Sequence, residues 1–155
     1  MAHPVKLDDI LEGMESASDE ARFYLNKKTG EVVMISDEEM RAAEEDEPLE
    51  KFPDWQQESI KIAQQILEND DYTPLPDKFD IHEYNIMEKF CLSINDDELR
   101  DIMYYSIKGS GAFRRFKDNI YHYDIEEDWY KFREEAFREI AVEWCEYNNI
   151  PFIEK

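Results

Sequence analysis

Two short apolar runs near the N-terminus have the character of paired β-strands. Residues 22–25 and 31–35 are rich in aromatic and β-branched side chains, and they enclose a segment, 26–30, that ends in Gly30. Runs of this kind around a glycine-ended turn predict a β-hairpin. Because an isolated hairpin is only marginally stable in water, we expect it to pack on helices or to pair with a further strand.

Most of the remaining chain follows the period of an α-helix. Residues 125–147 carry the longest pattern, in which apolar side chains recur every three or four positions over several turns. Such a broad stripe predicts a helix that packs along one whole side, so we expect it to be the central packing element. The stripe consists of Trp129, Phe132, Ala136, Phe137, Ile140, Ala141, Trp144 and Cys145.

Other helices are predicted from caps and apolar spacing. Asp54 can cap a helix that runs to about Asn69, and the side chains expected to face inward are Trp55, Ile62, Ala63, Ile66 and Leu67. Three pairs with the spacing of a capping box mark later helix starts: Asp80 with Glu83, Asn95 with Glu98, and Asp124 with Glu127. The side chains expected to be buried between these starts are Tyr84, Met87, Phe90, Cys91, Leu99, Ile102, Met103, Ile107, Phe113, Phe116 and Ile120.

These elements predict an α+β fold that is mainly α. An N-terminal hairpin or small antiparallel sheet would pack on four to five helices. The length of 155 residues suits a single domain that spans 1–155. Residues 37–50, which hold eight acidic residues and one basic residue, Arg41, offer little to bury and predict a short exposed helix followed by a loop.

The charge is unusual: 18 basic and 39 acidic residues give a net charge of -21. A surface of this sign repels phosphate backbones, so we expect neither direct nucleic-acid binding nor membrane binding. The N-terminal residues form no apolar signal segment, and no apolar run is long enough to cross a bilayer. Cys91 and Cys145 lie in apolar helical patterns, which predicts buried free thiols and a cytoplasmic location.

One segment departs from this acidic background. Residues 108–117 contain four basic residues, no acidic residue and two of the four glycines. If Gly109 ends one helix and Ser110 caps the next, the first amide groups of the new helix point outward without partners. The helix dipole adds partial positive charge at that point. The candidate anion- or partner-binding site therefore consists of Lys108, Gly109, Ser110, Gly111, Arg114 and Arg115.

A purely structural interpretation of the same segment is also open. At helical spacing, Phe113, Phe116 and Ile120 share one side and would be core, while the glycines form a corner. Asp118 is close enough in sequence to neutralise Arg114 or Arg115. Neither a phosphate-binding loop of the Walker type nor a dinucleotide-binding fingerprint is present.

The segment also resembles the signature of a known family. Residues 109–118, Gly-Ser-Gly-Ala-Phe-Arg-Arg-Phe-Lys-Asp, are similar to that of a family of small acidic bacterial proteins catalogued as uncharacterised protein family number 158. Residues 24–26 and 29–33 are similar to its N-terminal hairpin, and 129–133 and 140–145 are similar to its closing helix. The resemblance implies a bacterial origin and one domain, and it implies no activity, cofactor or catalytic residue.

Catalytic and metal-binding patterns are absent from the sequence. His3, His82 and His122 have acidic neighbours, but so many acids make such proximity common by chance. No zinc-protease, calcium-loop or nucleophile-elbow pattern occurs. We therefore assign no catalytic residue, no metal site and no cofactor.

Three functions follow as expectations. The first is a non-catalytic cytoplasmic binding or regulatory protein that presents an acidic surface to a protein partner and uses the basic segment as its local site. The second is an acidic mimic of nucleic acid that occupies a basic groove on another protein. The third is a small-molecule or nucleotide-binding enzyme, which would need a concave pocket containing Arg114 and a histidine.

Overall fold

The computed structural model describes residues 3–154, and these divide into two compact units. The first unit comprises the chain up to Asp80 together with the residues from Ile140 onward, and the second comprises Ile81–Glu139. The fold is α+β and mainly α, as predicted. That residues 1–155 behave as one domain stays a prediction.

The first unit contains the predicted hairpin. Strand β2, Ala21–Asn26, pairs antiparallel with β3, Val32–Ser36, and Gly30 in the turn has a φ of 77°. A third strand, β4, Tyr72–Pro74, pairs antiparallel with the other edge of β2. The hairpin thus gains the further strand that its marginal stability requires.

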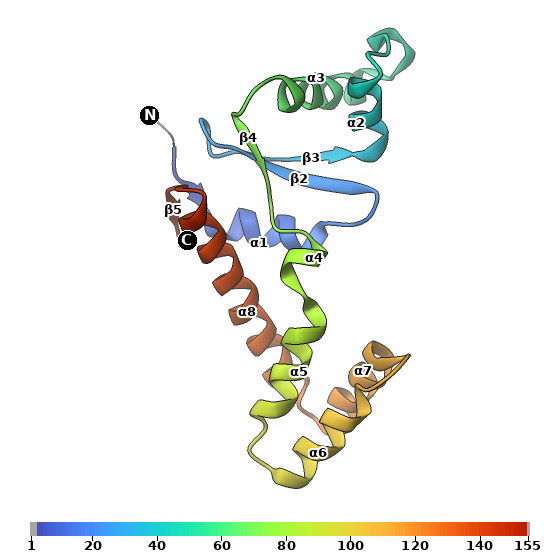
Figure 1. Ribbon diagram of the computed structural model, residues 1–155, viewed down its shortest axis with the longest axis vertical. Helices are drawn as coiled ribbons and strands as arrows, with labels where there is room; N and C mark the ends of the chain where they lie inside the picture. Colours follow the sequence, from blue (N-terminus) through green and yellow to red (C-terminus); the bar gives the residue numbers. More distant parts are fainter. Residues whose placement is uncertain (1–2, 155) are drawn as a thin grey trace. The chain divides into compact units, whose positions relative to one another are not determined.

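Helices cover both faces of this three-stranded sheet (Figure 1). One face carries Ile35, which lies in a core cluster with residues of α2, Asp37–Glu44, and α3, Asp54–Glu68. On the opposite face Phe23 lies against Gly13 of α1, Leu7–Ser16. The alternation of side chains along a strand places Phe23 and its neighbour Tyr24 on these opposite faces.

One side of helix α2 is buried, whereas its sequence predicts an exposed helix. Its Ala42 and Ala43 are buried, and small side chains of this kind allow two helices to approach closely. A capping box closes its start, where Ser36 and Glu39 each accept a hydrogen bond from the other's backbone N–H. A short 3₁₀ helix, η1, Leu49–Lys51, leads from α2 into α3.

The ends of the described chain meet in the first unit. Strand β1, Val5–Lys6, pairs in parallel with β5, Phe152–Ile153. Helix α4, Lys78–Ile81, follows β4 and leads out of this unit.

The second unit is helical. It contains α5, Glu83–Ser93, α6, Asp97–Ser106, α7, Ala112–His122, and the part of α8, Glu126–Tyr147, that precedes Ile140. Its core is aromatic. The Phe90 ring packs edge-on against three other rings, at centroid distances of 6.0 Å to Phe116, 5.4 Å to Trp129 and 5.5 Å to Phe132.

The predicted helix starts are displaced by one or more residues. Asp96, not Asn95, caps α6 and accepts a hydrogen bond from the Leu99 N–H. Asp80 forms its reciprocal box with Asp77, at the start of α4. In a segment with many adjacent acids, several residues can provide the cap, and the backbone path selects among them.

The residue that precedes α5 and the residue predicted to cap α8 both have a left-handed backbone. His82 precedes α5 with a φ of 53°, and Asp124 lies before α8 with a φ of 57°. Neither left-handed residue has the extended backbone that an N-cap with a side-chain hydrogen bond adopts. Helix α3 likewise follows Pro53, so Asp54 is its first residue and not its cap.

Four side chains predicted to be buried are exposed: Trp55 by 74%, Leu67 by 50%, Ile102 by 39% and Phe113 by 56%. On α7 the buried residues Ala112, Phe116 and Ile120 are spaced by four positions, so the buried arc is narrow and Phe113 lies at its edge. The predicted stripe of α8 is better preserved, with Trp129, Phe137, Ala141 and Cys145 buried. Within residues 3–154, no helix has the length and apolar character needed to span a membrane.

Candidate functional site

The basic segment forms a tight corner between α6 and α7. Gly109 and Gly111 have φ values of 81° and 79°, which L side chains rarely adopt, so glycine is required at both turns. Gly111, not Ser110, is the residue that precedes α7. The prediction of two glycines at a helix-helix junction is therefore confirmed, and the cap is shifted by one position.

Arg115 closes this corner by binding backbone. Its Nε donates to the carbonyl of Ser106 at 2.7 Å, its Nη1 to the carbonyl of Ser110 at 2.6 Å, and its Nη2 to that of Lys108 at 2.7 Å. The last carbonyls of a helix have no partners within the helix, and a cation there also complements the dipole. Arg115 thus holds the end of α6 against the start of its own helix.

Lys108 is engaged as well. Its ammonium lies 3.9 Å from the centre of the Tyr104 ring and 3.7 Å from a carboxylate oxygen of Glu88. The hydrogen bond with Tyr104 raises the pKa of the lysine above its ordinary value. One residue earlier, the Ile107 carbonyl accepts a hydrogen bond from the Tyr84 hydroxyl at 2.9 Å.

Arg114 differs from both of these cations. It is exposed, and among the residues that the structure describes its side chain has neither an ion pair nor a hydrogen bond. The expected neutralisation of Arg114 or Arg115 by Asp118 is not observed in this described part of the chain. The six candidate residues therefore separate into a structural corner and one unengaged guanidinium.

The exposed side of α7 extends from that guanidinium. Phe113, Lys117 and Tyr121 follow one another at intervals of four, and with Arg114 they form a surface that we name the α7 face. Phe113 is 56% exposed and Tyr121 is 52% exposed. The Phe113 ring meets Tyr84 edge-on at 6.4 Å, and the Tyr121 hydroxyl lies 2.8 Å from that of Tyr130.

The first turn of α7 lacks the acids found at other helix starts. Every other helix described within residues 3–154 has at least one acidic residue in its first turn. The helix dipole favours acidic residues in a first turn. Helix α7 instead has the basic residue Arg114 in its first turn. The guanidinium is thus held where the local electrostatics of the helix disfavour it.

This placement makes the Arg114→Glu variant a test of local electrostatics. We expect the free energy of unfolding to rise by about 0.3–1 kcal/mol, because a carboxylate replaces a cation in the first turn. Urea unfolding at low and high salt measures the change, and salt should diminish it. A decrease in stability would contradict the unengaged state of Arg114.

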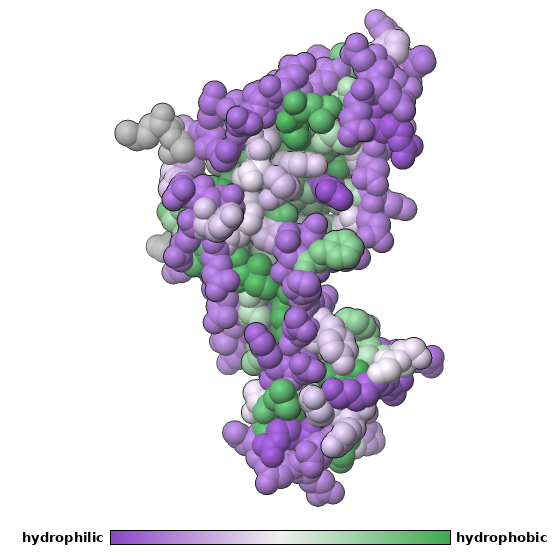
Figure 2. Space-filling view, in the orientation of Figure 1, coloured by the Kyte–Doolittle hydropathy of each residue, from purple (hydrophilic) through white to green (hydrophobic). Residues whose placement is uncertain are grey.

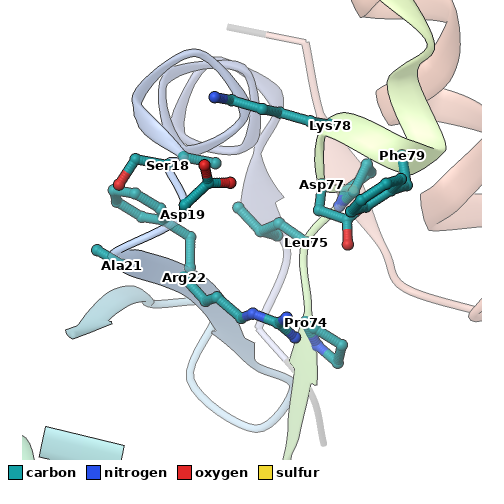
Figure 3. Close-up of a pocket in the computed structure, with 12 residues that line it drawn as sticks. Ser18, Asp19, Ala21, Arg22, Pro74, Leu75, Asp77, Lys78 and Phe79 are labelled. Atoms are coloured by element: carbon teal, nitrogen blue, oxygen red, sulfur yellow. The ribbon is translucent and has the colours of Figure 1, made fainter. Parts of the chain in front are cut away.

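A second concentration of charge lies in the first unit, around Arg22. A small hollow of about 120 Å³ is lined by Asp19, Arg22, Lys78 and Phe79 together with Pro74, the last residue of β4 (Figure 3). In this view the Arg22 side chain extends from β2 toward Pro74. Phe79 is 81% exposed at the rim.

Arg22 also lines a larger hollow on the face of the sheet that α2 and α3 cover. This hollow measures about 450 Å³. It is lined by Arg22, Tyr24, Ile35, Asp37, Met40, Arg41, Glu44, Ile66 and Leu67. Sequence reasoning missed it, although Arg41 was the lone basic residue of its acidic segment and Arg22 interrupted an apolar strand.

The two cysteines are poor nucleophiles. Both thiols are free and buried, as predicted. Burial raises the pKa of Cys91 to about 11 and that of Cys145 to about 11. Because the thiolate is the reactive form, neither residue is activated at neutral pH.

Comparison with known proteins places the chain in a family. The model of an uncharacterised protein family, UPF0158, matches residues 2–155, which confirms the resemblance found in the sequence. No curated protein and no solved structure matches the chain.

Proposed function

Because the chain belongs to the uncharacterised protein family UPF0158, which supplies no activity to carry over, we propose from the geometry that it is a non-catalytic cytoplasmic binding protein. Its α7 face docks an acidic segment of a protein partner. The observation that carries this proposal is the unengaged Arg114, held beside exposed aromatic rings at the start of a helix.

The distribution of charge supports an acidic occupant. The second unit, Ile81–Glu139, contains half of the basic residues of the chain but only about a third of its acidic residues. Within it, residues 108–117 contain no acid at all. Since screening in physiological salt limits charge interactions to roughly 8 Å, a docked segment is governed by these local cations and not by the distant acids.

The aromatic residues give the same face its apolar contact area. Phe113 and Tyr121 are rigid side chains that lose little conformational entropy on binding, and exposed rings of this kind are enriched at protein interfaces. Arg114 adds a planar group that can pair with a carboxylate through two hydrogen bonds. A partner segment that combines acidic and apolar residues fits this chemistry.

The distribution of acidic residues outside the α7 face supports a role in solubility and not in mimicry of nucleic acid. Some of them occur in the first turns of helices in both units, where the helix dipole accounts for them. Figure 2 likewise shows hydrophilic residues distributed over the viewed face of both units. A mimic of nucleic acid requires carboxylates concentrated on one face, so binding by the α7 face is the better supported function.

The test compares two double variants that change the charge equally. Arg114→Glu with Lys117→Glu reverses the cations of the α7 face, whereas Lys89→Glu with Lys131→Glu reverses two exposed cations elsewhere in the same unit. Capture from bacterial cytoplasm at physiological salt should lose its specific partner, by about tenfold or more, only in the first variant. Urea unfolding verifies that both variants fold.

A crosslinking measurement defines the occupant. A photo-reactive phenylalanine analogue at position 113 should attach to a partner peptide rich in Asp and Glu, and raised salt should reduce the yield. Attachment to a segment without acidic residues, or equal loss of the partner in both double variants, contradicts the proposal.

A further inference from the structure

The larger hollow of the first unit shares no residue with the α7 face and carries an inference of its own. Strands β2 and β3 supply Tyr24 and Ile35, and α3 supplies Ile66 and Leu67. Its volume of about 450 Å³ lies within the range of small-molecule sites in proteins, which is roughly 300–1,000 Å³.

Helix α2 turns one consistent face toward this hollow. Asp37, Met40, Arg41 and Glu44 are spaced by three and four positions and all line it. The same spacing would allow Arg41 to pair with either carboxylate within the helix. Neither pair forms within the described residues, so the three charges remain available to a ligand.

Arg22 brings a second guanidinium from the sheet. Along β2, Arg22 and Tyr24 alternate onto the face that carries Ile35, with Arg22 directly opposite Ile35 in the register. Arg22 also has no ion pair in the part of the chain that the structure describes. Two guanidinium groups and two carboxylates thus surround one hollow without neutralising each other in pairs.

Three of these charged side chains act on the pKa of the Tyr24 phenol. Burial raises its pKa, Arg22 lowers it, and Asp37 and Glu44 raise it. The guanidinium and both carboxylates are therefore close enough to act on one hydroxyl from different elements. Apolar atoms of Ile35, Met40, Ile66 and Leu67 complete the lining.

We infer that this hollow binds a small zwitterion of the α-amino acid type with an apolar side chain. The ligand carboxylate pairs with Arg22 and Arg41, its ammonium faces Asp37 and Glu44, and its side chain packs on the apolar lining. A simple anion would meet two uncompensated carboxylates, and a simple cation would meet two guanidinium groups. A group with both charges satisfies the whole set.

The test uses L-leucine with two truncated probes on the full-length protein. 4-Methylpentanoate retains the carboxylate and apolar chain without the ammonium, and isopentylamine retains the ammonium without the carboxylate. Titration followed by NMR should show saturable shifts at Tyr24 and Ile35 with L-leucine. Each truncated probe should bind at least about tenfold more weakly, since it leaves charged partners unmatched.

Substitutions test whether the charged side chains of the hollow bind the ligand. Arg41→Gln and Glu44→Gln should each weaken L-leucine binding by about tenfold, whereas Lys61→Gln, an exposed cation on α3 outside the hollow, should leave it unchanged. Equal affinity for 4-methylpentanoate would make this an anion site and overturn the inference. Absence of saturable shifts with L-leucine, L-methionine and L-phenylalanine at about 10 mM would overturn it as well, because binding this weak leaves almost no specific interaction energy. Neither result bears on the α7 face.

Discussion

Replacing Phe90 by alanine is expected to lower the free energy of unfolding by about 3–5 kcal/mol. Phe90 is only 4% exposed, and its ring meets those of Phe116 on α7 and of Trp129 and Phe132 on α8. Truncation removes these edge-to-face contacts and leaves a cavity that three rigid rings cannot fill by small shifts.

Urea unfolding monitored by tryptophan fluorescence measures the loss, since Trp129 lies 5.4 Å from the Phe90 ring. Phe79→Ala is the matched control because Phe79 is 81% exposed, and it should change the stability by no more than about 0.5 kcal/mol. A cost below about 1 kcal/mol for Phe90→Ala would mean that these rings do not form the core of the second unit.

Replacing Arg115 by methionine is expected to lower the free energy of unfolding by about 1–3 kcal/mol. The change removes three hydrogen bonds from a charged donor to the carbonyls of Ser106, Lys108 and Ser110. The corner is exposed, so water can replace part of what is lost, and this keeps the cost moderate.

Arg114→Met is the natural comparison, because the two arginines are adjacent and only Arg115 is bound to the corner. It should leave the stability within about 0.5 kcal/mol of the unaltered protein. Arg115→Lys should restore little, since an ammonium cannot reach three carbonyls that a planar guanidinium spans. Equal effects of the two methionine variants would contradict the structural role of Arg115.

The elements with strong periodicity could be predicted from the sequence. The hairpin was predicted because two β-rich runs flank a turn that requires glycine, and α8 was predicted because its apolar stripe continues over its whole length. Strand β4 was missed. Tyr72–Pro74 is short and ends in proline, which indicates a connector, and only pairing with β2 in three dimensions makes it a strand.

The candidate site, too, could be predicted from the sequence only in part. The glycine corner and its lack of acids were visible in the sequence, but the role of Arg115 was not. Its partners are backbone carbonyls, which every residue possesses, so no pattern of side chains can indicate them. The hollow at Arg22 and Arg41 was invisible for a different reason: it forms only where α2 and α3 meet the sheet.

The parallel pairing of β1 with β5 has a consequence for synthesis on the ribosome. Val5 precedes Phe152 by almost the whole described chain, so this pair cannot form until the residues between them have been translated. Every residue of Ile81–Glu139 has been translated by then. The strand β1 is therefore paired only after the whole second unit has been translated, and in the meantime its edge needs protection from other growing chains.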